Sequence, residues 1–141
     1  MRATAIFFFT LTLSQFAFGQ NRKLTDEEIN NSTAVKIGFV ETPKCDQVDE
    51  LFKKDLGNKT IFLFLQGGIA PMVYTTDNAF ENKYGIYFHD FGCVSPDYNC
   101  IIKYNSKVFD YLNKTYGNKW KREIRKDVIG LKEWNKKKNG L

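Results

Sequence analysis

The spacing of apolar residues predicts alternating strands and helices over most of the chain. Residues 33–40 alternate apolar and polar positions, as in a half-buried strand, and residues 60–65 and 86–91 are apolar on both faces, as in buried strands. Elsewhere, apolar residues recur every three or four positions, which is the spacing of amphipathic helices. Helices are therefore expected over residues 43–56, 77–84, 101–116 and 120–134.

This order of elements predicts an α/β fold. We expect a small three-stranded, mainly parallel sheet flanked by helices and ending in two C-terminal helices. The connections are short, so residues 33–134 should form a single domain, preceded by a loose polar segment over 20–32 and followed by a basic tail over 135–141. Within the loose segment, Thr25 and Glu28 have the spacing of a capping box for one helical turn.

The first nineteen residues are predicted to be a secretory signal peptide. Arg2 precedes an apolar stretch, and Ala17 and Gly19 are the small residues of a cleavage site after Gly19. The apolar stretch is shorter than the roughly 20 residues of a spanning helix, and no later segment is longer. We therefore expect an exported protein, periplasmic or secreted, without a membrane span.

A candidate binding edge follows from the predicted topology. Parallel strands place their carboxyl ends at one edge of the sheet, where open α/β folds bind ligands. The candidate ligand-contacting residues at this edge are Gln66, Gly67, Gly68 and Gly92. A plain turn is the competing interpretation of the Gln-Gly-Gly sequence, because it lacks the Lys and Ser/Thr of a P-loop.

Three cysteines make a disulfide the expectation for an exported chain. Cys93 and Cys100 flank a loop that contains the turn-forming pair Pro96 and Asp97, and we expect these two cysteines to be bonded. A link from Cys45 to either of them closes a longer loop and is an alternative, as are three free thiols.

The same cysteines allow a thiol-dependent function. Cys45 lies near a predicted helix N-terminus, which lowers the pKa of a thiol, and His89 is the single histidine. On an extended strand, however, His89 and Cys93 would be roughly 13 Å apart. We therefore assign no catalytic residue and keep Cys45, Cys93 and His89 as candidates. No short pair of ligands anchors a metal site, so neither a metal nor another cofactor is predicted.

Charge is distributed unevenly along the chain. Residues 20–100 carry 8 Lys and Arg against 12 Asp and Glu, a net charge of −4, whereas residues 101–141 carry 12 against 4, a net charge of +8. Lysine outnumbers arginine 17 to 4, which does not favour nucleic-acid binding, because arginine is the preferred reader of phosphates and bases. A solvated face is the simplest interpretation. The helix over 120–134 could also dock on an acidic partner or a lipid surface.

Two segments support a resemblance to known proteins. They read FENKYGIYFHDFGC and KREIRKDVIGLKEW, and over residues 79–134 the chain resembles small exported proteins of uncharacterised function in Bacteroidetes. The resemblance implies a bacterial envelope or secreted location and transfers no activity or functional residues.

We predict a non-catalytic binding or interaction protein with a protein partner, and the sequence does not indicate its oligomeric state. One alternative is a thioredoxin-like redox or nucleophilic activity that uses Cys45, Cys93 and Cys100. The other is a secreted effector or immunity-type partner that binds through the basic C-terminal helices.

Overall fold

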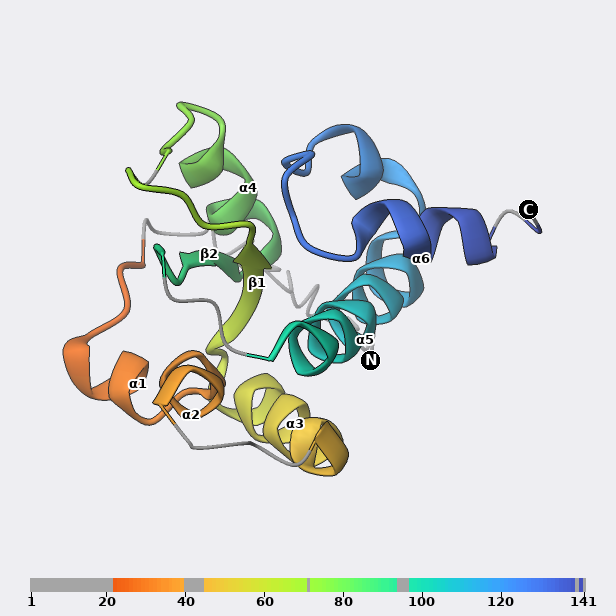
Figure 1. The fold of residues 1–141 in the computed structure, drawn as a ribbon. Helices are drawn as coiled ribbons and strands as arrows, with labels where there is room; N and C mark the ends of the chain where they lie inside the picture. Colours follow the sequence, from red (N-terminus) through yellow and green to blue (C-terminus); the bar gives the residue numbers. More distant parts are fainter. Residues whose placement is uncertain (1–21, 40–44, 71, 94–96, 139, 141) are drawn as a thin grey trace, which may run out of the picture.

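The computed structural model describes residues 22–39, 45–70, 72–93, 97–138 and 140. It contains helices, short 3-10 helices and two strands (Figure 1). In chain order these elements are α1 (Asp26–Asn30), α2 (Thr33–Phe39), η1 (Cys45–Gln47), α3 (Val48–Asn58), β1 (Ile61–Leu65), α4 (Asp77–Tyr84), β2 (Ile86–Asp90), α5 (Tyr98–Tyr116), η2 (Lys119–Arg122) and α6 (Leu131–Lys138).

The sheet consists of two parallel strands, with Ile61 opposite Ile86 and Leu65 opposite Asp90. Every residue of β1 is buried, as expected for an apolar run covered on both sides. α5 packs against β1, α3 and α6, while α4 packs against β2. The predictions of strands over 60–65 and 86–91, of the helix between them and of parallel pairing are therefore confirmed. The predicted burial of the second strand on both faces is wrong, because only Ile86 of β2 is buried and its other residues are half-buried.

The predicted third strand is wrong, because residues 33–39 form helix α2. Ala34 and Ile37 are each 1% exposed, and their separation of three residues places both on one helix face. The backbone N–H of Thr33 donates to the buried carboxylate of Asp55 at 3.2 Å. In so short a segment an alternating pattern and a helical pattern overlap, and packing on the core selects the helix.

The outer edge of β1 pairs instead with residues close to the C-terminus. Leu65 and Val128 form an isolated antiparallel bridge. Gln66 N–H donates to the Asp127 carbonyl at 3.1 Å, and Ile129 N–H donates to the Phe64 carbonyl at 3.1 Å. This pairing requires extended backbone at a place where the apolar spacing predicts a helix.

Residues 120–134 consequently do not form the single helix predicted from the sequence. They comprise η2, an irregular stretch and the first half of α6. The apolar positions are nevertheless buried as expected, and Trp120 stacks on Phe109 with a centroid distance of 5.8 Å. Trp134 reaches the same cluster, with its ring centroid 5.6 Å from that of Trp120. The apolar spacing thus correctly predicts which side chains are buried, but not the conformation of the backbone between them.

The N-terminal segment predicted to be loose contains a short capped helix. Thr25 Oγ1 accepts a hydrogen bond from Glu28 N–H at 3.2 Å, and Thr25 N–H donates to Glu28 Oε2 at 2.9 Å. The predicted capping box is therefore confirmed. The signal peptide over 1–19 and the predicted helix start at Thr42 and Pro43 lie outside the described residues. The basic tail begins inside α6.

Candidate functional site

The carboxyl ends of the two strands meet, as the parallel topology requires. A Cβ atom on Gly67 would collide with the Gly92 carbonyl oxygen and with Asp90 Oδ1. Gly92 has a φ of +65° and donates its N–H to Asp90 Oδ1 at 2.7 Å. The structure thus brings together the predicted edge residues Gly67 and Gly92 as a close backbone contact that only glycine at position 67 permits. Gly68 is exposed beside them, and ligand binding by these glycines stays a prediction.

The disulfide joins Cys45 to Cys100, so the expected Cys93–Cys100 bond is wrong and one of the alternatives is found. Cys100 is fully buried on the core face of α5, whereas Cys93 is a free thiol on the surface. The Cys93 sulfur lies 3.7 Å from the Gly68 carbonyl oxygen. Asp97 lies within 4.8 Å of the bonded sulfurs, but a disulfide offers no thiolate to a metal. The disulfide is consistent with export to an oxidising compartment.

His89 is half-buried on β2 among aromatic rings. Its ring centroid is 4.7 Å from that of Phe91 and 5.8 Å from that of Phe62, both with edge-to-face geometry. Burial lowers the pKa of His89, which favours the neutral imidazole. Because the Cys45 sulfur is in the disulfide, a Cys45–His89 dyad does not exist in this oxidised form. These contacts explain His89 as a packing residue.

The largest cavity among those found in the described chain is a cleft of about 970 Å³ between α4 and the segment that follows α5. Of the predicted edge residues, Gln66 lines it. The complete lining is Gln66, Tyr74, Thr76, Ala79, Phe80, Lys83, Arg122, Glu123, Ile124, Arg125, Lys126, Asp127 and Lys132.

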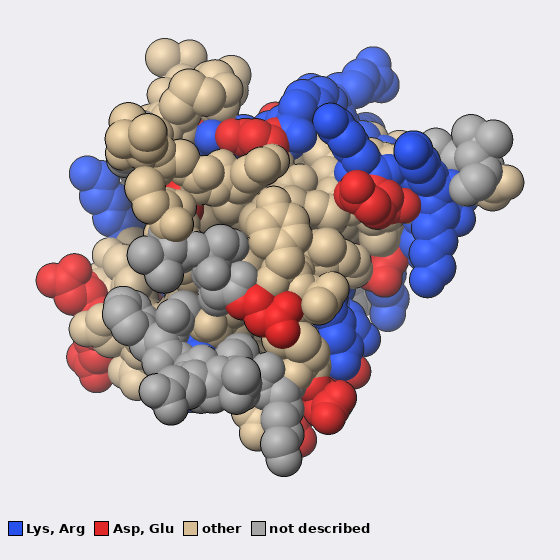
Figure 2. All heavy atoms as spheres, viewed as in Figure 1, with Lys and Arg blue, Asp and Glu red and all other residues tan. Residues whose placement is uncertain are grey.

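The cleft has an apolar floor and a basic rim. The floor includes Phe80 and Ile124, and the basic rim is defined here as Arg122, Lys126 and Lys132. None of these three cations forms an ion pair with another described residue. Figure 2 shows Lys and Arg gathered over η2 and α6, opposite an uncharged projection that corresponds to the loop before α4 in Figure 1.

The other charges that line the cleft are paired. Lys83 Nζ lies 2.7 Å from both carboxylate oxygens of Glu123, and the Tyr84 hydroxyl donates to Glu123 Oε2 at 3.1 Å. The hydrogen bond from Lys83 lowers the pKa of Glu123, and the same bond raises the pKa of Lys83. Both groups therefore stay charged at neutral pH, while the cations of the basic rim stand outside any ion pair with another described residue.

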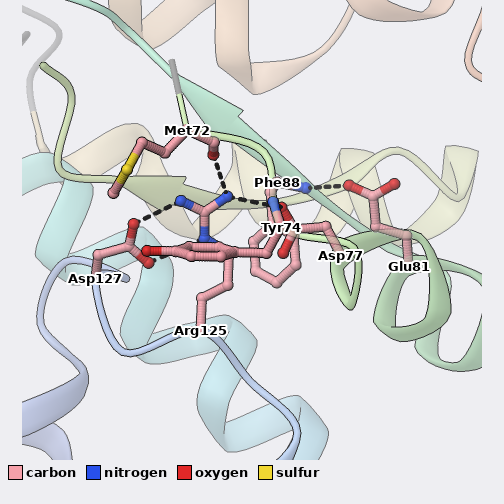
Figure 3. Close-up of polar contacts among 7 residues, drawn as sticks. All are labelled: Met72, Tyr74, Asp77, Glu81, Phe88, Arg125 and Asp127. Atoms are coloured by element: carbon pink, nitrogen blue, oxygen red, sulfur yellow. Dashed lines mark hydrogen bonds and ion pairs between the residues drawn. The ribbon is translucent and has the colours of Figure 1, made fainter. Parts of the chain in front are cut away.

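A buried arginine, Arg125, lines the cleft, and Figure 3 shows its polar contacts. The side chain of Arg125 is 5% exposed and donates from Nε and Nη2 to the two oxygens of Asp127, at 3.0 and 2.5 Å. Its Nη1 donates to Asp77 Oδ2 and to the Met72 carbonyl oxygen, both at 2.8 Å. We call Arg125, Asp77 and Asp127 the Arg125 cluster. Hydrogen bonding from Arg125 lowers the pKa of Asp127, which keeps this carboxylate ionised.

The Arg125 cluster also holds the loop before α4. The guanidinium lies 4.6 Å from the ring centroid of Tyr74, within the range of a cation–π contact. Tyr74 N–H donates to Asp77 Oδ2 at 2.9 Å, and Asp77 N–H donates to the Tyr74 carbonyl oxygen at 3.0 Å. One carboxylate thus links the arginine, the loop and the first turn of α4.

A second, smaller cavity of about 320 Å³ lies beside β2. Glu81, Tyr87 and His89 line it together with residues of the N-terminal segment such as Leu24 and Ile29. Glu81 accepts a hydrogen bond from Phe88 N–H at 2.9 Å, and burial raises the pKa of its carboxyl group.

Sequence reasoning missed the Arg125 cluster. The predicted helices place Arg125 within residues 120–134 and Asp77 at the start of residues 77–84. The available signal was the Arg-x-Asp spacing of residues 125 and 127, which would not make a side-chain pair on a regular helix.

No family model, curated protein or solved structure matches the chain significantly. Within the described residues, no helix has the length and apolar character needed to cross a bilayer.

Proposed function

We propose that this protein is a non-catalytic binding protein whose cleft holds an amphipathic anion, a ligand with an acidic head and an apolar body. The observation that carries the proposal is the pairing of an apolar floor with the basic rim. Three cations without ion-pair partners stand around buried apolar side chains. The acidic head would lie against these cations and the apolar body against the floor.

The dimensions and charges of the cleft support this class of ligand. Its volume of about 970 Å³ is at the upper end of small-molecule sites, which are roughly 300–1,000 Å³. Clustered charges of one sign at a concave surface raise the local concentration of the opposite ion. Arg122 can in addition bind a carboxylate or phosphate through two parallel hydrogen bonds.

The acidic groups of the cleft are held as ions. Hydrogen bonds from Lys83 and Arg125 lower the pKa values of Glu123 and Asp127, so both carboxylates stay ionised near neutral pH. The arrangement therefore holds charge in place. We further propose export by the signal peptide over 1–19, in keeping with the resemblance to exported Bacteroidetes proteins.

An acidic, apolar segment of another protein offers the same chemistry as a small amphiphile. If the protein is an effector or an immunity-type partner, it would bind such a segment through the basic rim. The thiol alternative has less support, because Cys45 and Cys100 are bonded to each other and Cys93 remains without a paired cysteine in the described chain.

The proposal can be tested with dodecanoate, which is kept below the concentration at which it forms micelles. Isothermal titration calorimetry should show binding that weakens with added salt, and dodecyltrimethylammonium, with the opposite head charge, should not bind. The variant Lys126→Glu/Lys132→Glu should weaken dodecanoate binding by about tenfold or more.

The matched control is Lys136→Glu/Lys137→Glu, which changes net charge equally on exposed residues of α6 that do not line the cleft. This control should stay within about twofold of the wild type. Failure of dodecanoate to bind the wild-type protein, or an equal loss in the control, would overturn the proposed function.

A further inference from the structure

The loop before α4 carries an unusual concentration of exposed apolar side chains. Ile69 is 97% exposed, Val73 82%, Met72 59% and Tyr74 43%. We call these four residues the apolar loop. They are four of the six large hydrophobic residues that are exposed within the described chain. Residues 66–76 contain no charged residue. Exposed apolar clusters of this kind mark surfaces that bind a partner or a membrane.

Buried polar contacts tie two residues of the apolar loop to Arg125. The Met72 carbonyl oxygen accepts from Arg125 Nη1 at 2.8 Å, and the Tyr74 ring lies against the same guanidinium. Folding these residues back onto the body of the protein would break contacts of a buried arginine. The exposed side chain of Val73 therefore lies between two residues that contact Arg125.

The apolar loop borders the cleft that carries the basic rim, because one of its four residues, Tyr74, also lines that cleft. Tyr74 and Arg125 line the cleft together with Arg122, Lys126 and Lys132. Figure 2 shows the uncharged projection of the loop and the cluster of Lys and Arg on the same face of the molecule. Apolar side chains beside unpaired cations match the two layers of an anionic bilayer surface, the acyl boundary and the headgroups.

We propose that the apolar loop docks on an anionic lipid surface. Its side chains enter the acyl boundary while the basic rim contacts the headgroups. This inference rests on the proposed function, because it makes a membrane lipid the amphipathic anion of the cleft. Charge complementarity favours a lipid surface, and so does the small number of residues in the loop and the rim. Stable protein interfaces use about 20–30 residues on each side, far more than this loop and rim provide.

Vesicle cosedimentation tests the inference, using protein purified after export. Vesicles of phosphatidylethanolamine with phosphatidylglycerol should bind the wild type, and vesicles of phosphatidylethanolamine with phosphatidylcholine should not. The variant Ile69→Ser/Val73→Ser should lower binding to the anionic vesicles by about tenfold or more, because two exposed apolar side chains no longer enter the bilayer. Both side chains are exposed, so the fold should be retained, which circular dichroism checks.

Leu56→Ser, at an exposed leucine of α3, is the control for loss of an apolar surface residue and should bind like the wild type. Ile69→Ser/Val73→Ser should retain the affinity for soluble dodecanoate, which separates this inference from the proposed function. Wild-type protein that binds dodecanoate but not anionic vesicles would overturn the inference alone. Vesicle binding that is unaffected by Ile69→Ser/Val73→Ser would also overturn it, as would loop-dependent binding of a soluble glutamate- and leucine-rich peptide without vesicle binding.

Discussion

Two buried polar regions of the molecule differ in what they hold together. In the core network around Asn105 and Asp55, side chains bind elements to one another. Asn105 Nδ2 donates to the carbonyl oxygens of Phe64 and Ile129, both at 2.9 Å, and its Oδ1 accepts from Phe64 N–H at 3.0 Å. Asp55 Oδ2 accepts from the Tyr104 hydroxyl at 2.6 Å. In the Arg125 cluster, by contrast, the contacts reach an exposed loop and line a cleft.

The two regions also differ in how completely their buried aspartates are satisfied. Both carboxylate oxygens of Asp55 accept hydrogen bonds, although burial raises the pKa of this group. Asp77 Oδ1 in the Arg125 cluster is buried with no hydrogen-bond partner among the described residues. Buried ion pairs seldom maximise stability. The comparison indicates that the core network joins helices and strands to one another, whereas the Arg125 cluster also fixes the shape of a surface.

The largest effect should come from the disulfide, which joins η1 to α5 beside the core network. Replacing both Cys45 and Cys100 by Ser removes a link between residues 55 positions apart and should lower the free energy of unfolding by about 4 kcal/mol, mainly through the entropy of the unfolded chain. Urea unfolding measures this. Cys93→Ser, at the exposed free thiol, is the control and should change little. Equal stability of the two variants would contradict the prediction.

Arg125→Met should have the next largest effect, about 3 kcal/mol, because it leaves the buried Asp77 carboxylate without its cation. Adding Asp77→Asn should recover a large part of the loss, since the remaining group is then neutral. Urea unfolding of the single and double variants measures the difference. Arg125→Met should also release the loop before α4, and limited proteolysis measures this release. Fluorescence of Tyr74 cannot be used, because it is not separable from that of the six other tyrosines. A double variant no more stable than the single one would count against the cluster as described.

Asn105→Ala should cost about 2 kcal/mol, because it leaves the Phe64 N–H and the Ile129 carbonyl oxygen without the bonds that Asn105 makes. The Phe64 carbonyl oxygen keeps its bond from Ile129 N–H, which limits the loss. Asn118→Ala, at an exposed asparagine without a side-chain capping bond, is the matched control and should stay within about 0.5 kcal/mol. In contrast to Arg125→Met, Asn105→Ala should not be rescued by changing one partner side chain, because its partners are backbone groups.

The smallest effect concerns pH. Burial lowers the pKa of His89 below its ordinary value of 6.5, against the opposing charge of Asp90. The unfolded chain then binds a proton at a higher pH than the folded protein does, so stability should fall as the pH drops below about 6.5. His89→Gln lacks this titration and should show a flatter dependence in urea unfolding between neutral and mildly acidic pH. If the stability of the wild type and that of His89→Gln depend on pH in the same way, the pKa of His89 is the same in the folded and unfolded chains and the prediction is wrong.

The sequence predicted the parts of the fold that repeat a local pattern. The apolar runs of β1 and β2 and the long stripe of α5 are dictated by residues close together in the chain. The strand prediction over residues 33–39 is wrong because alternation over so few residues also fits one helix face. The prediction of a helix over 120–134 is wrong because Asn105 and β1, which are distant in sequence, hold the backbone before α6 extended.

The candidate site was less predictable for the same reason. The meeting of Gly67 with Gly92 follows from parallel strands and was predicted. The cleft depends on the contact of Arg125 with Asp77, 48 residues apart, and no local pattern marks such a pair. The cysteine pairing likewise depends on where η1 lies against α5, which the spacing of cysteines does not encode.

The central claim, that the cleft binds an amphipathic anion, is tested most directly by methyl NMR during titration with dodecanoate. We predict the largest shift changes at the methyl groups of Ala79 and Ile124, which line the cleft. The methyl groups of Leu24 and Ile29, which line the smaller cavity beside β2, should stay unchanged. Changes confined to Leu24 and Ile29, or no saturable change at Ala79 and Ile124, would contradict the account.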